Sequence, residues 1–516
     1  MKTINIDGKS LDLDSILSVL NDPGTKVNIS ASTLKKIQKS ADFLGKEIIN
    51  SKVIYGINTG FGPMASHLMA RDQIVQLQEN LIRSHAVGVG DPMPEKFVLA
   101  AMIIRLNTLA EGYSGASQEL IQQLKIFINK RIIPVILEHG GVGASGDLVQ
   151  LAHIALALIG EGKVNYQGKT RPTSDVLKQL KIKPYQLRPK EGLSLINGTS
   201  FMSGIGSVIC HDSDMLLNLA IKTGAWSLEL VNGYTDGFSE KLHSLRPHKG
   251  QVAVARKLRE LLASSKLLKS RELINKQVNL GSDVKEIPEF VQEVYSIRCI
   301  PQILGPIYDT LQKTKQVIET EINSVTDNPI VYVDKKTFLH GGNFHGDYIS
   351  SSLDQLKMTL VRLTMLSERR VNFFLNHNVN RFLPPFINLN KIGLNLGLQA
   401  LQFPATSTTA KSQTLAYPQY VHSIPTNADN QDIVSMGTDS ALITTQVVDN
   451  AFVVLAIELV TLAQAVDYLK YQNKLSKSSN ELYKAVRRIL PKVVEDRMIG
   501  YDLTMLVSEV KKGVIK

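Results

Sequence analysis

The stretch VDNAFVVLAIELVTLAQAV, residues 448–466, repeats apolar side chains at the spacing of an α-helix. Its large apolar residues recur every three or four positions, which places them on one face of a helix. No proline interrupts the chain between Pro425 and Pro491, so a long helix can form here. Glu458 and Asp467 lie in the most apolar part, which favours a buried helix over a membrane span. A core of long helices is therefore predicted.

The part of the chain before residue 198 has a different pattern. Short helical patterns alternate there with loops rich in glycine and proline, such as YGINTGFGPM at residues 55–64 and VGVGDPMP at residues 87–94. Loops of this kind commonly carry binding and catalytic residues. We therefore predict a mainly α protein with a loop-rich N-terminal region over residues 1–198 and a bundle of long helices with C-terminal helices over residues 199–516.

Composition narrows the class of protein. With 43% hydrophobic and 20% charged residues, the chain has the balance of a globular protein. Cys210 and Cys299 lie far apart without the spacing of zinc ligands, which argues against a disulfide framework and a structural zinc site and fits a reducing cytoplasm. The N-terminus has acids where a signal peptide needs an apolar core. The net charge of +11 comes from dispersed basic residues without a nucleic-acid-binding motif, so we expect neither nucleic acid nor a membrane as partner.

The sequence GVGASG at residues 141–146 matches the GxGxxG pattern of dinucleotide-binding loops. It follows the strand-like run RIIPVIL at residues 131–137 and opens an apolar helix, which is the context that such a loop needs. A doubly wound sheet would require several more strands, and only KVNYQGK at residues 163–169 could supply one before helical patterns take over. The dinucleotide interpretation therefore lacks its sheet.

The same loop contains Ala144-Ser145-Gly146, which can form an electrophile. In a sharply bent loop, the amide nitrogen of Gly146 can attack the carbonyl carbon of Ala144, and loss of two waters leaves a ring that carries a methylidene group from Ser145. Glycine at 146 and alanine at 144 keep side chains out of this close backbone approach. A helix that begins near Asp147 would favour the negative charge that develops when a nucleophile adds to the ring.

The chain as a whole resembles the aromatic amino acid ammonia-lyases, because eight of its segments look like sequence blocks of that family and occur in the same order. They are VIYGINTGFG (53–62), LQENLIRSHAVGVG (77–90), GVGASGDL (141–148), LINGTS (195–200), YSIRCIPQ (295–302), SVTDNP (324–329), HGGNFHGD (340–347) and NQDIVSMG (430–437). The resemblance implies that Ala144, Ser145 and Gly146 become a 4-methylidene-imidazol-5-one (MIO) group, so that the N-terminal region bears MIO and no external cofactor is needed. It also implies a cytoplasmic homotetramer that acts on an amino acid and shares its active sites between chains.

The resemblance assigns roles to single residues. Tyr55 matches the general base that removes a β-proton, a role that requires stabilisation of the phenolate because tyrosine is normally protonated at neutral pH. Arg298 matches the residue that binds the substrate carboxylate through its guanidinium fork, and Asn328 is its second partner. Three more matches surround the MIO group, the amino group and the substrate ring: Asn197, Tyr295 and Phe344.

Four other positions need a separate interpretation. His340 and His345 could suggest a metal site, but neither has a carboxylate at the spacing of zinc ligands, so no metal is predicted. Lys411 stands where the family commonly has an acid, and Ser117 stands where many members have arginine. These two departures could alter an interface or a lid.

The substrate is predicted from the pair Ser84-His85 and from the segment around Gln431. A Ser-His pair is usual in histidine ammonia-lyases and also occurs in some tyrosine ammonia-lyases, and an imidazole can hydrogen-bond either substrate ring. Histidine enzymes typically have glutamate at the position of Gln431, whereas Asn427 and Gln431, which would share a face if helical, look like the pair of tyrosine and phenylalanine enzymes. Long blocks also look closest to bacterial tyrosine ammonia-lyases. Tyrosine, converted to p-coumarate, is therefore predicted, with histidine, converted to urocanate, as the alternative.

Two other activities stay open at this point. A 2,3-aminomutase would use the same electrophile and return the amine at the β-carbon. A non-catalytic helical oligomer would keep the fold, but it would have no need of Tyr55, Arg298 and the tripeptide together.

Overall fold

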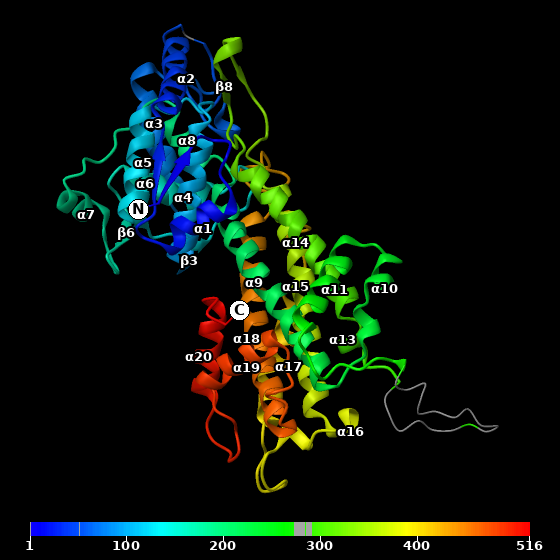
Figure 1. Ribbon diagram of the computed structural model, residues 1–516. Helices are drawn as coiled ribbons and strands as arrows, with labels where there is room; N and C mark the ends of the chain where they lie inside the picture. The colour runs from blue at the N-terminus through cyan, green and yellow to red at the C-terminus, as the bar shows by residue number, and fades with distance from the viewer. Residues whose placement is uncertain (1, 51, 273–283, 285–290, 516) are drawn as a thin grey trace. The chain divides into compact units, whose positions relative to one another are not determined.

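The computed structural model describes residues 2–50, 52–272, 284 and 291–515. Helices dominate these residues, and the strands among them form only short sheets of two or three strands, so the predicted mainly α class is confirmed (Figure 1). Packing divides the chain into two compact units. Unit 1 comprises Met1–Cys210, Thr314–Asp354 and Pro418–Leu442, and unit 2 comprises His211–Lys313, Gln355–Tyr417 and Ile443–Lys516. The predicted boundary after residue 198 falls near Cys210, but unit 1 also includes two later segments.

Unit 1 combines short strands with helices of moderate length. Its helices are α1 (Leu13–Asn21), α2 (Ala31–Ile49), η1 (Gly62–Met64), η2 (Arg71–Gln73), α3 (Ile74–His85), α4 (Glu95–Ala110), α5 (Gln118–Lys130), α6 (Leu148–Leu158), α7 (Thr173–Leu180), α8 (Glu191–Ile196) and η4 (Val333–Lys335). Its strands are β1 (Thr3–Ile6), β2 (Lys26–Ile29), β3 (Val89–Pro92), β4 (Ile133–Pro134), β5 (Leu137–His139), β6 (Lys163–Tyr166), β7 (Lys169–Pro172), β8 (Ile330–Tyr332) and β9 (Thr337–Leu339).

Four long helices run through a boundary between the units: α9 (Ser200–Leu230), α14 (Ile300–Ile322), α15 (Asp347–Leu375) and α18 (Gly437–Leu469). The other helices of unit 2 are η3 (Thr235–Phe238), α10 (Glu240–Ser244), α11 (Lys249–Leu262), α13 (Tyr295–Arg298), α16 (His377–Asn380), η5 (Pro385–Ile387), η6 (Gln399–Leu401), α17 (Gln402–Thr414), α19 (Lys477–Ile489) and α20 (Gly500–Lys511). By length and composition α18 could cross a membrane, but 78% of its most apolar window is buried in the protein, which fits the predicted core helix.

The strands do not form a doubly wound sheet in the described part of unit 1. The run before the glycine loop becomes β4, which pairs antiparallel with β6, and β6 pairs antiparallel with β7. The pairing of β1 with β2 is parallel, and it joins Thr3 to Lys26. The glycine loop therefore lies outside a dinucleotide-binding fold, as the sequence pattern predicted.

Helix α4 forms the centre of unit 1, because every residue from Phe97 to Ala110 is buried. A helix that is buried on all sides needs apolar residues all round, and the sequence FVLAAMIIRLNTLA meets this condition except at Arg105, Asn107 and Thr108. Asn107 uses its side-chain amide to donate to the backbone carbonyl of Ile322 at 2.8 Å. The partners of Arg105 lie beside the candidate site.

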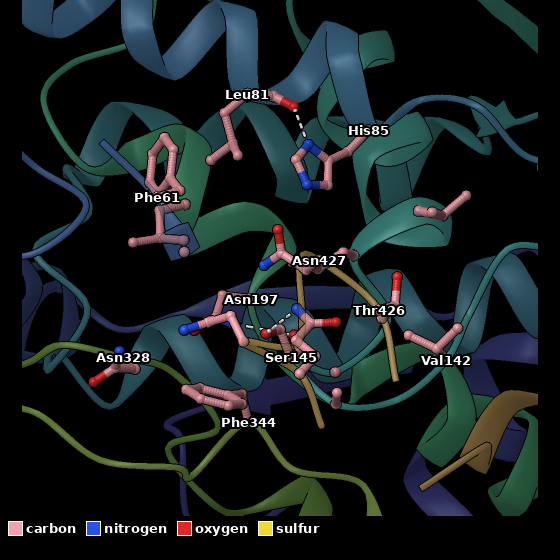
Figure 2. Close-up of a pocket in the computed structure, with 18 of the residues that line it drawn as sticks. Phe61, Leu81, His85, Val142, Ser145, Asn197, Asn328, Phe344, Thr426 and Asn427 are labelled. Carbon is pink, nitrogen blue, oxygen red and sulfur yellow. Dashed lines mark hydrogen bonds between the residues drawn. The ribbon is translucent and has the colours of Figure 1, made fainter. Parts of the chain in front are cut away.

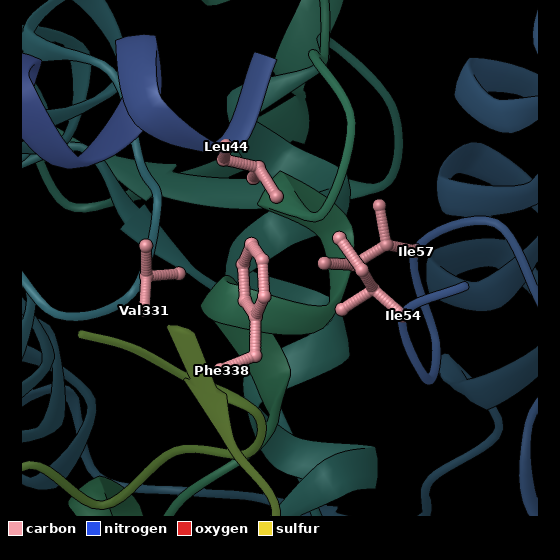
Figure 3. Packing of buried hydrophobic residues seen from close by; sticks show 5 residues of the cluster. All are labelled: Leu44, Ile54, Ile57, Val331 and Phe338. Carbon is pink, nitrogen blue, oxygen red and sulfur yellow. The ribbon is translucent and has the colours of Figure 1, made fainter. Parts of the chain in front are cut away.

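A smaller apolar cluster holds the segment that carries Tyr55. The ring of Phe338 of β9 lies between Leu44 of α2, Val331 of β8, and Ile54 and Ile57, and all five are buried (Figure 3). Full burial of one such side chain stabilises the fold by about 1.5–3 kcal/mol. The cluster therefore fixes the backbone on both sides of Tyr55.

In unit 2 the long helices are joined by a buried ion pair. The Nε of Arg370 on α15 donates to the carboxylate of Glu458 on α18 at 2.6 Å, and both side chains are fully buried. The Nη2 of Arg370 also donates to the hydroxyl of Thr223 on α9 at 3.1 Å. A shift of one helix would separate these partners and leave a buried charge uncompensated. The ion pair therefore opposes movement of the three helices along one another.

Candidate active site

A cavity of about 710 Å³ opens in unit 1, and most of the predicted site residues line it (Figure 2). It is formed by the segment of Tyr55, the last turns of α3, the glycine loop before α6, and single residues around it. The predicted residues on its wall are Tyr55, Ser84, His85, Ala144, Ser145, Gly146, Asn197, Asn328, Phe344, Asn427 and Gln431. The sequence blocks therefore meet in one place, although hundreds of residues separate them along the chain.

The Ala144-Ser145-Gly146 loop is bent and leaves no room for larger residues. Gly143 and Gly146 have φ angles of 76° and 71°, a region that favours glycine. A Cβ atom at Gly146 would lie 2.0 Å from the carbonyl oxygen of Gly198, and one at Gly143 would lie 2.1 Å from the Oγ of Ser435. Glycine is therefore required at both positions.

Two amide side chains hold Ser145 in the cavity. The Nδ2 of Asn197 donates to the carbonyl oxygen of Ser145 at 3.1 Å, and the Nε2 of Gln431 donates to its hydroxyl at 2.9 Å. Figure 2 shows Asn197 and Ser145 beside each other on the cavity wall. The Oδ1 of Asn197 is buried and has no hydrogen-bond partner among the described residues. Since buried polar atoms normally have a partner, this oxygen is free to accept from a group that arises or binds here.

Asp147 anchors the far end of the loop. Its Oδ2 accepts from the backbone N–H groups of Phe201 and Met202 at 2.8 and 3.0 Å, and its Oδ1 accepts from the hydroxyl of Thr438 at 2.7 Å. The side chain is fully buried, and burial raises its pKa to about 6 although these hydrogen bonds and Arg105 act in the opposite direction. The carboxylate thus joins the loop to the first turn of α9.

We expect Asp147 to make stability depend on pH. Because the pKa in the folded state is raised from 3.8 to about 6, the folded protein binds this proton more tightly, and the resulting stability is present below about pH 4 and lost as pH rises through about 6. The free energy of unfolding is measured with urea at about pH 4.5 and about pH 7. Between these pH values it should fall by up to about 3 kcal/mol more in the wild type than in Asp147→Asn. An Asp91→Asn variant, which changes an exposed carboxylate, should behave as the wild type. Equal pH dependence in Asp147→Asn and the wild type would contradict the assignment.

His85 lies on the last turn of α3, where its ring lines the cavity. Its Nδ1 is 2.9 Å from the carbonyl oxygen of Leu81, and a hydrogen bond to that oxygen places the proton on Nδ1 (Figure 2). The Nε2 of a neutral ring is then an acceptor. The Oγ of Ser84 also donates to the carbonyl oxygen of Leu81, at 3.1 Å. The end of α3 therefore offers one acceptor to a ligand, the Nε2 of His85.

Tyr55 also lines the cavity and is half-buried. Its phenol oxygen accepts from the backbone N–H of Gly62 at 3.1 Å. Asn328 is nearly buried, and its side-chain oxygen accepts from the N–H of Gly341 at 2.9 Å. Phe344 faces the same space (Figure 2).

The segment of Asn427 and Gln431 is not a helix, and the predicted shared helix face is wrong. Thr426 and Gln431 pair as a short antiparallel bridge with backbone hydrogen bonds of 3.1 and 3.2 Å. The loop between them includes Asn427, Ala428 and Asp429, all with positive φ. Such a conformation is unfavourable for residues other than glycine, and a helix cannot contain it. Both side chains still line the cavity, but they reach it from a tight turn.

Tyr295 and Arg298 do not line this cavity. Both belong to α13 in unit 2, where the guanidinium of Arg298 lies 4.7 Å from the centre of the Tyr295 ring. The Nε of Arg298 donates to the carbonyl oxygen of Glu293 at 3.2 Å. Their roles toward the substrate stay predictions.

The remaining positions singled out in the sequence have structural environments of their own. His345 lies 3.4 Å from Asp347, and the described residues contain no group of three His, Cys, Asp or Glu side chains arranged to hold a metal. Ser117 caps α5, and its hydroxyl donates to the buried carboxylate of Glu191 at 2.7 Å. Lys411 is exposed on α17. Arg105 was not among the predicted site residues. Its charge inside an apolar run of the sequence was the feature that could have marked it.

Comparison with known proteins identifies the family. The family model for aromatic amino acid lyases matches residues 11–488. The chain belongs to this family. The lyase is 36% identical to a histidine ammonia-lyase of Caldanaerobacter subterraneus subsp. tengcongensis over 516 residues, which cover 100% of the lyase and 98% of that protein. It is 39% identical to a histidine ammonia-lyase of Treponema denticola over 503 residues, with coverage of 98% and 96%.

A solved structure supports the fold assignment. The crystal structure of tyrosine aminomutase from Streptomyces globisporus matches the lyase with a TM-score of 0.96 at 35% identity, and the match covers 99% of the lyase and 97% of that chain. The predicted family and the predicted enzyme class, a carbon–nitrogen lyase, are therefore confirmed.

The prediction of tyrosine as substrate and p-coumarate as product is wrong. The curated relatives described above are histidine ammonia-lyases, which favours the alternative. That prediction was based on the neutral amide of Gln431, on the likeness of Asn427 and Gln431 to the pair of tyrosine and phenylalanine enzymes, and on the long blocks. Since that segment is a turn, the spacing of the two residues carries no information about a shared helix face.

Proposed function

We propose that the lyase eliminates ammonia from L-histidine to give urocanate. The observation that carries this proposal is the high identity, over nearly the whole chain, to histidine ammonia-lyases. The cavity is consistent with it, because His85 and Gln431 offer polar atoms to an imidazole ring beside the loop of Ser145.

We further propose that Ala144, Ser145 and Gly146 mature into the MIO group. The residues fit such a group, because the glycines permit the bend, Asn197 donates to the Ser145 carbonyl, and the unpartnered Oδ1 of Asn197 can accept a new donor. MIO supplies an electrophile that activates the substrate for loss of ammonia.

The chain's own residues have three tasks in this reaction. The phenol oxygen of Tyr55 removes the β-proton, and the N–H of Gly62 stabilises the charge on that oxygen. The ring of Phe344 packs beside the substrate ring, and the amide of Asn328 contacts the carboxylate.

The substrate carboxylate also needs a cation, and the residues that the structure describes on the cavity wall include neither lysine nor arginine. We propose that Arg298 and Tyr295 supply this part of the site in a cytoplasmic homotetramer, each reaching a cavity of another subunit. A guanidinium is suited to this role because it binds a carboxylate with two parallel hydrogen bonds.

The substrate assignment is tested with L-histidine, L-tyrosine and L-phenylalanine, assayed side by side for ammonia and for the unsaturated acid. We expect urocanate from histidine with a much higher kcat/KM than that for the other two. Preferential formation of p-coumarate or cinnamate would overturn the choice of substrate. Formation of a β-amino acid without free ammonia would identify an aminomutase.

Replacing His85 by phenylalanine should weaken histidine binding. If Nε2 of His85 accepts from the substrate imidazole, the variant leaves that N–H unpaired, at a cost of about 1–3 kcal/mol. The KM for histidine should then rise by about 10- to 100-fold. The surface variant His377→Phe should keep the wild-type KM. An unchanged KM in His85→Phe would show that this histidine does not contact the substrate ring.

A further inference from the structure

Arg105 is a fully buried cation whose hydrogen bonds all go to backbone carbonyls. Its Nε donates to the oxygen of Ser194 at 2.9 Å, and Nη2 donates to the same oxygen and to that of Asn197 at 2.8 Å. Its Nη1 donates to the oxygen of Thr326 at 3.2 Å. A guanidinium has a planar fork of five N–H donors, so three carbonyl groups are held at fixed angles to one another.

These carbonyls belong to two segments of the active site. Asn197 donates to Ser145, and Thr326 lies two residues before Asn328 on the cavity wall. The two segments are far apart in the sequence, and the guanidinium of Arg105 donates hydrogen bonds to both.

Arg105 also touches the backbone that supports the tripeptide. A Cβ atom at Gly198 would lie 2.3 Å from Nη1 of Arg105 and 2.3 Å from the oxygen of Thr326, so these groups are in close contact. On the other side, the Gly198 oxygen accepts from the N–H of Asp147 at 2.8 Å and limits the space at Gly146. A movement of the guanidinium would therefore pass through Gly198 to the loop.

The buried charge of Arg105 is balanced by neighbours. Burial lowers the pKa of Arg105 to about 10, and the charges of Asp327 and Asp147 act in the opposite direction, so the side chain stays protonated at neutral pH. Asp327 also pairs with the buried Lys190 at 2.8 Å. Arg105, Lys190, Asp327 and Asp147 thus form a group of buried side chains whose charges influence one another.

We propose that Arg105 is a positioning residue that sets the amide of Asn197 and the backbone of Gly198 against Ala144-Ser145-Gly146, and thereby controls both maturation of the loop and turnover. The proposal rests on the proposed MIO group, and it does not depend on which amino acid is the substrate. Arg105 acts through Asn197 and Gly198, because it does not line the cavity.

The test compares Arg105→Lys with Arg370→Lys. Both replacements keep a buried charge and lose the guanidinium fork, but Arg370 is paired with Glu458 in unit 2 and does not line the cavity. Each purified full-length variant is digested, and the mass of the peptide that contains residues 144–146 is measured by mass spectrometry. The kcat and KM of each undigested variant are measured with the amino acid that the wild type deaminates best.

We expect Arg105→Lys to retain a fraction of the peptide at full mass and to lower kcat by about 100-fold, since a misplacement of about 1 Å at a reacting centre has this effect. In Arg370→Lys the peptide should be fully dehydrated by two waters, and the variant should keep the kcat of the wild type, even if its melting temperature falls as much as that of Arg105→Lys. Complete loss of two waters with wild-type kcat in Arg105→Lys would overturn the proposal.

A second variant, Arg105→Gln, controls for a failure of Arg105→Lys to fold. If Arg105→Lys is insoluble, Arg105→Gln, which removes the buried charge and keeps one amide donor, takes its place with the same expected result. If both variants fail to fold while Arg370→Lys folds, Arg105 serves stability alone and the proposal is overturned. Full peptide mass in the wild type would instead refute the MIO proposal, so the two failures are distinguishable.

Discussion

Replacing Ser145 by alanine is expected to abolish ammonia elimination, with kcat/KM at least about 1000-fold below that of the wild type. The methylidene carbon of the electrophile comes from the Ser145 side chain, and alanine has no hydroxyl to lose. The 2.9 Å hydrogen bond from Gln431 to the Ser145 hydroxyl belongs to the unmodified loop and is absent from both the variant and the matured loop, so the variant should lose little stability. Activity is measured as release of ammonia and unsaturated acid, and circular dichroism checks the fold.

Ser207→Ala is the matched control. Ser207 is buried in α9 and donates to the carbonyl oxygen of Ser203 at 2.8 Å, and it does not line the cavity. This variant loses an equally small hydroxyl but should keep wild-type kcat/KM. Substantial turnover by Ser145→Ala would exclude the tripeptide as the source of the electrophile.

Replacing Tyr55 by phenylalanine should lower kcat by about 100- to 10,000-fold, the range expected when a general base is removed. The change deletes the phenol oxygen that accepts from Gly62, while Ile54 and Ile57 keep the neighbouring backbone in the apolar cluster. KM should change much less, because the ring remains on the cavity wall. Steady-state kinetics across a pH series checks the result. In Tyr55→Phe the pH dependence of kcat should lack the step that reports the base in the wild type.

Tyr113→Phe is the control for this variant. Tyr113 packs near Tyr332, with ring centres 6.4 Å apart, and does not line the cavity. It should keep kcat, KM and the pH profile of the wild type. A Tyr55→Phe variant with the same kcat as Tyr113→Phe would assign the β-proton to another base.

Apolar periodicity predicted the long helices because those helices are buried along most of their length. Residues 448–466 lie within α18, and the absence of proline after Pro425 allowed the helix to continue for 33 residues. The turn at Asn427–Asp429 could not be recognised in this way, because positive φ at three residues other than glycine leaves no pattern of apolar side chains. The shared helix face of Asn427 and Gln431, expected only if their segment were helical, is therefore not formed.

The order of the sequence blocks predicted which residues meet in the cavity, but not what supports them. Arg105 resembles no active-site motif, and only its position inside an apolar run of α4 marked it as unusual. A buried arginine requires several acceptors, so such a residue indicates a polar layer inside the core. The sequence likewise did not reveal that Arg298 lies outside the cavity wall of unit 1, because a motif does not specify where its segment lies in the fold.

The central claim is that Ala144, Ser145 and Gly146 form the electrophile of this lyase. It is tested most directly by mass spectrometry of the peptide that contains these residues, taken from active wild-type protein. We predict a mass two waters below that of the unmodified peptide, with the loss localised to residues 144–146 by fragmentation. An unmodified peptide in protein that still releases ammonia from an amino acid would contradict the claim.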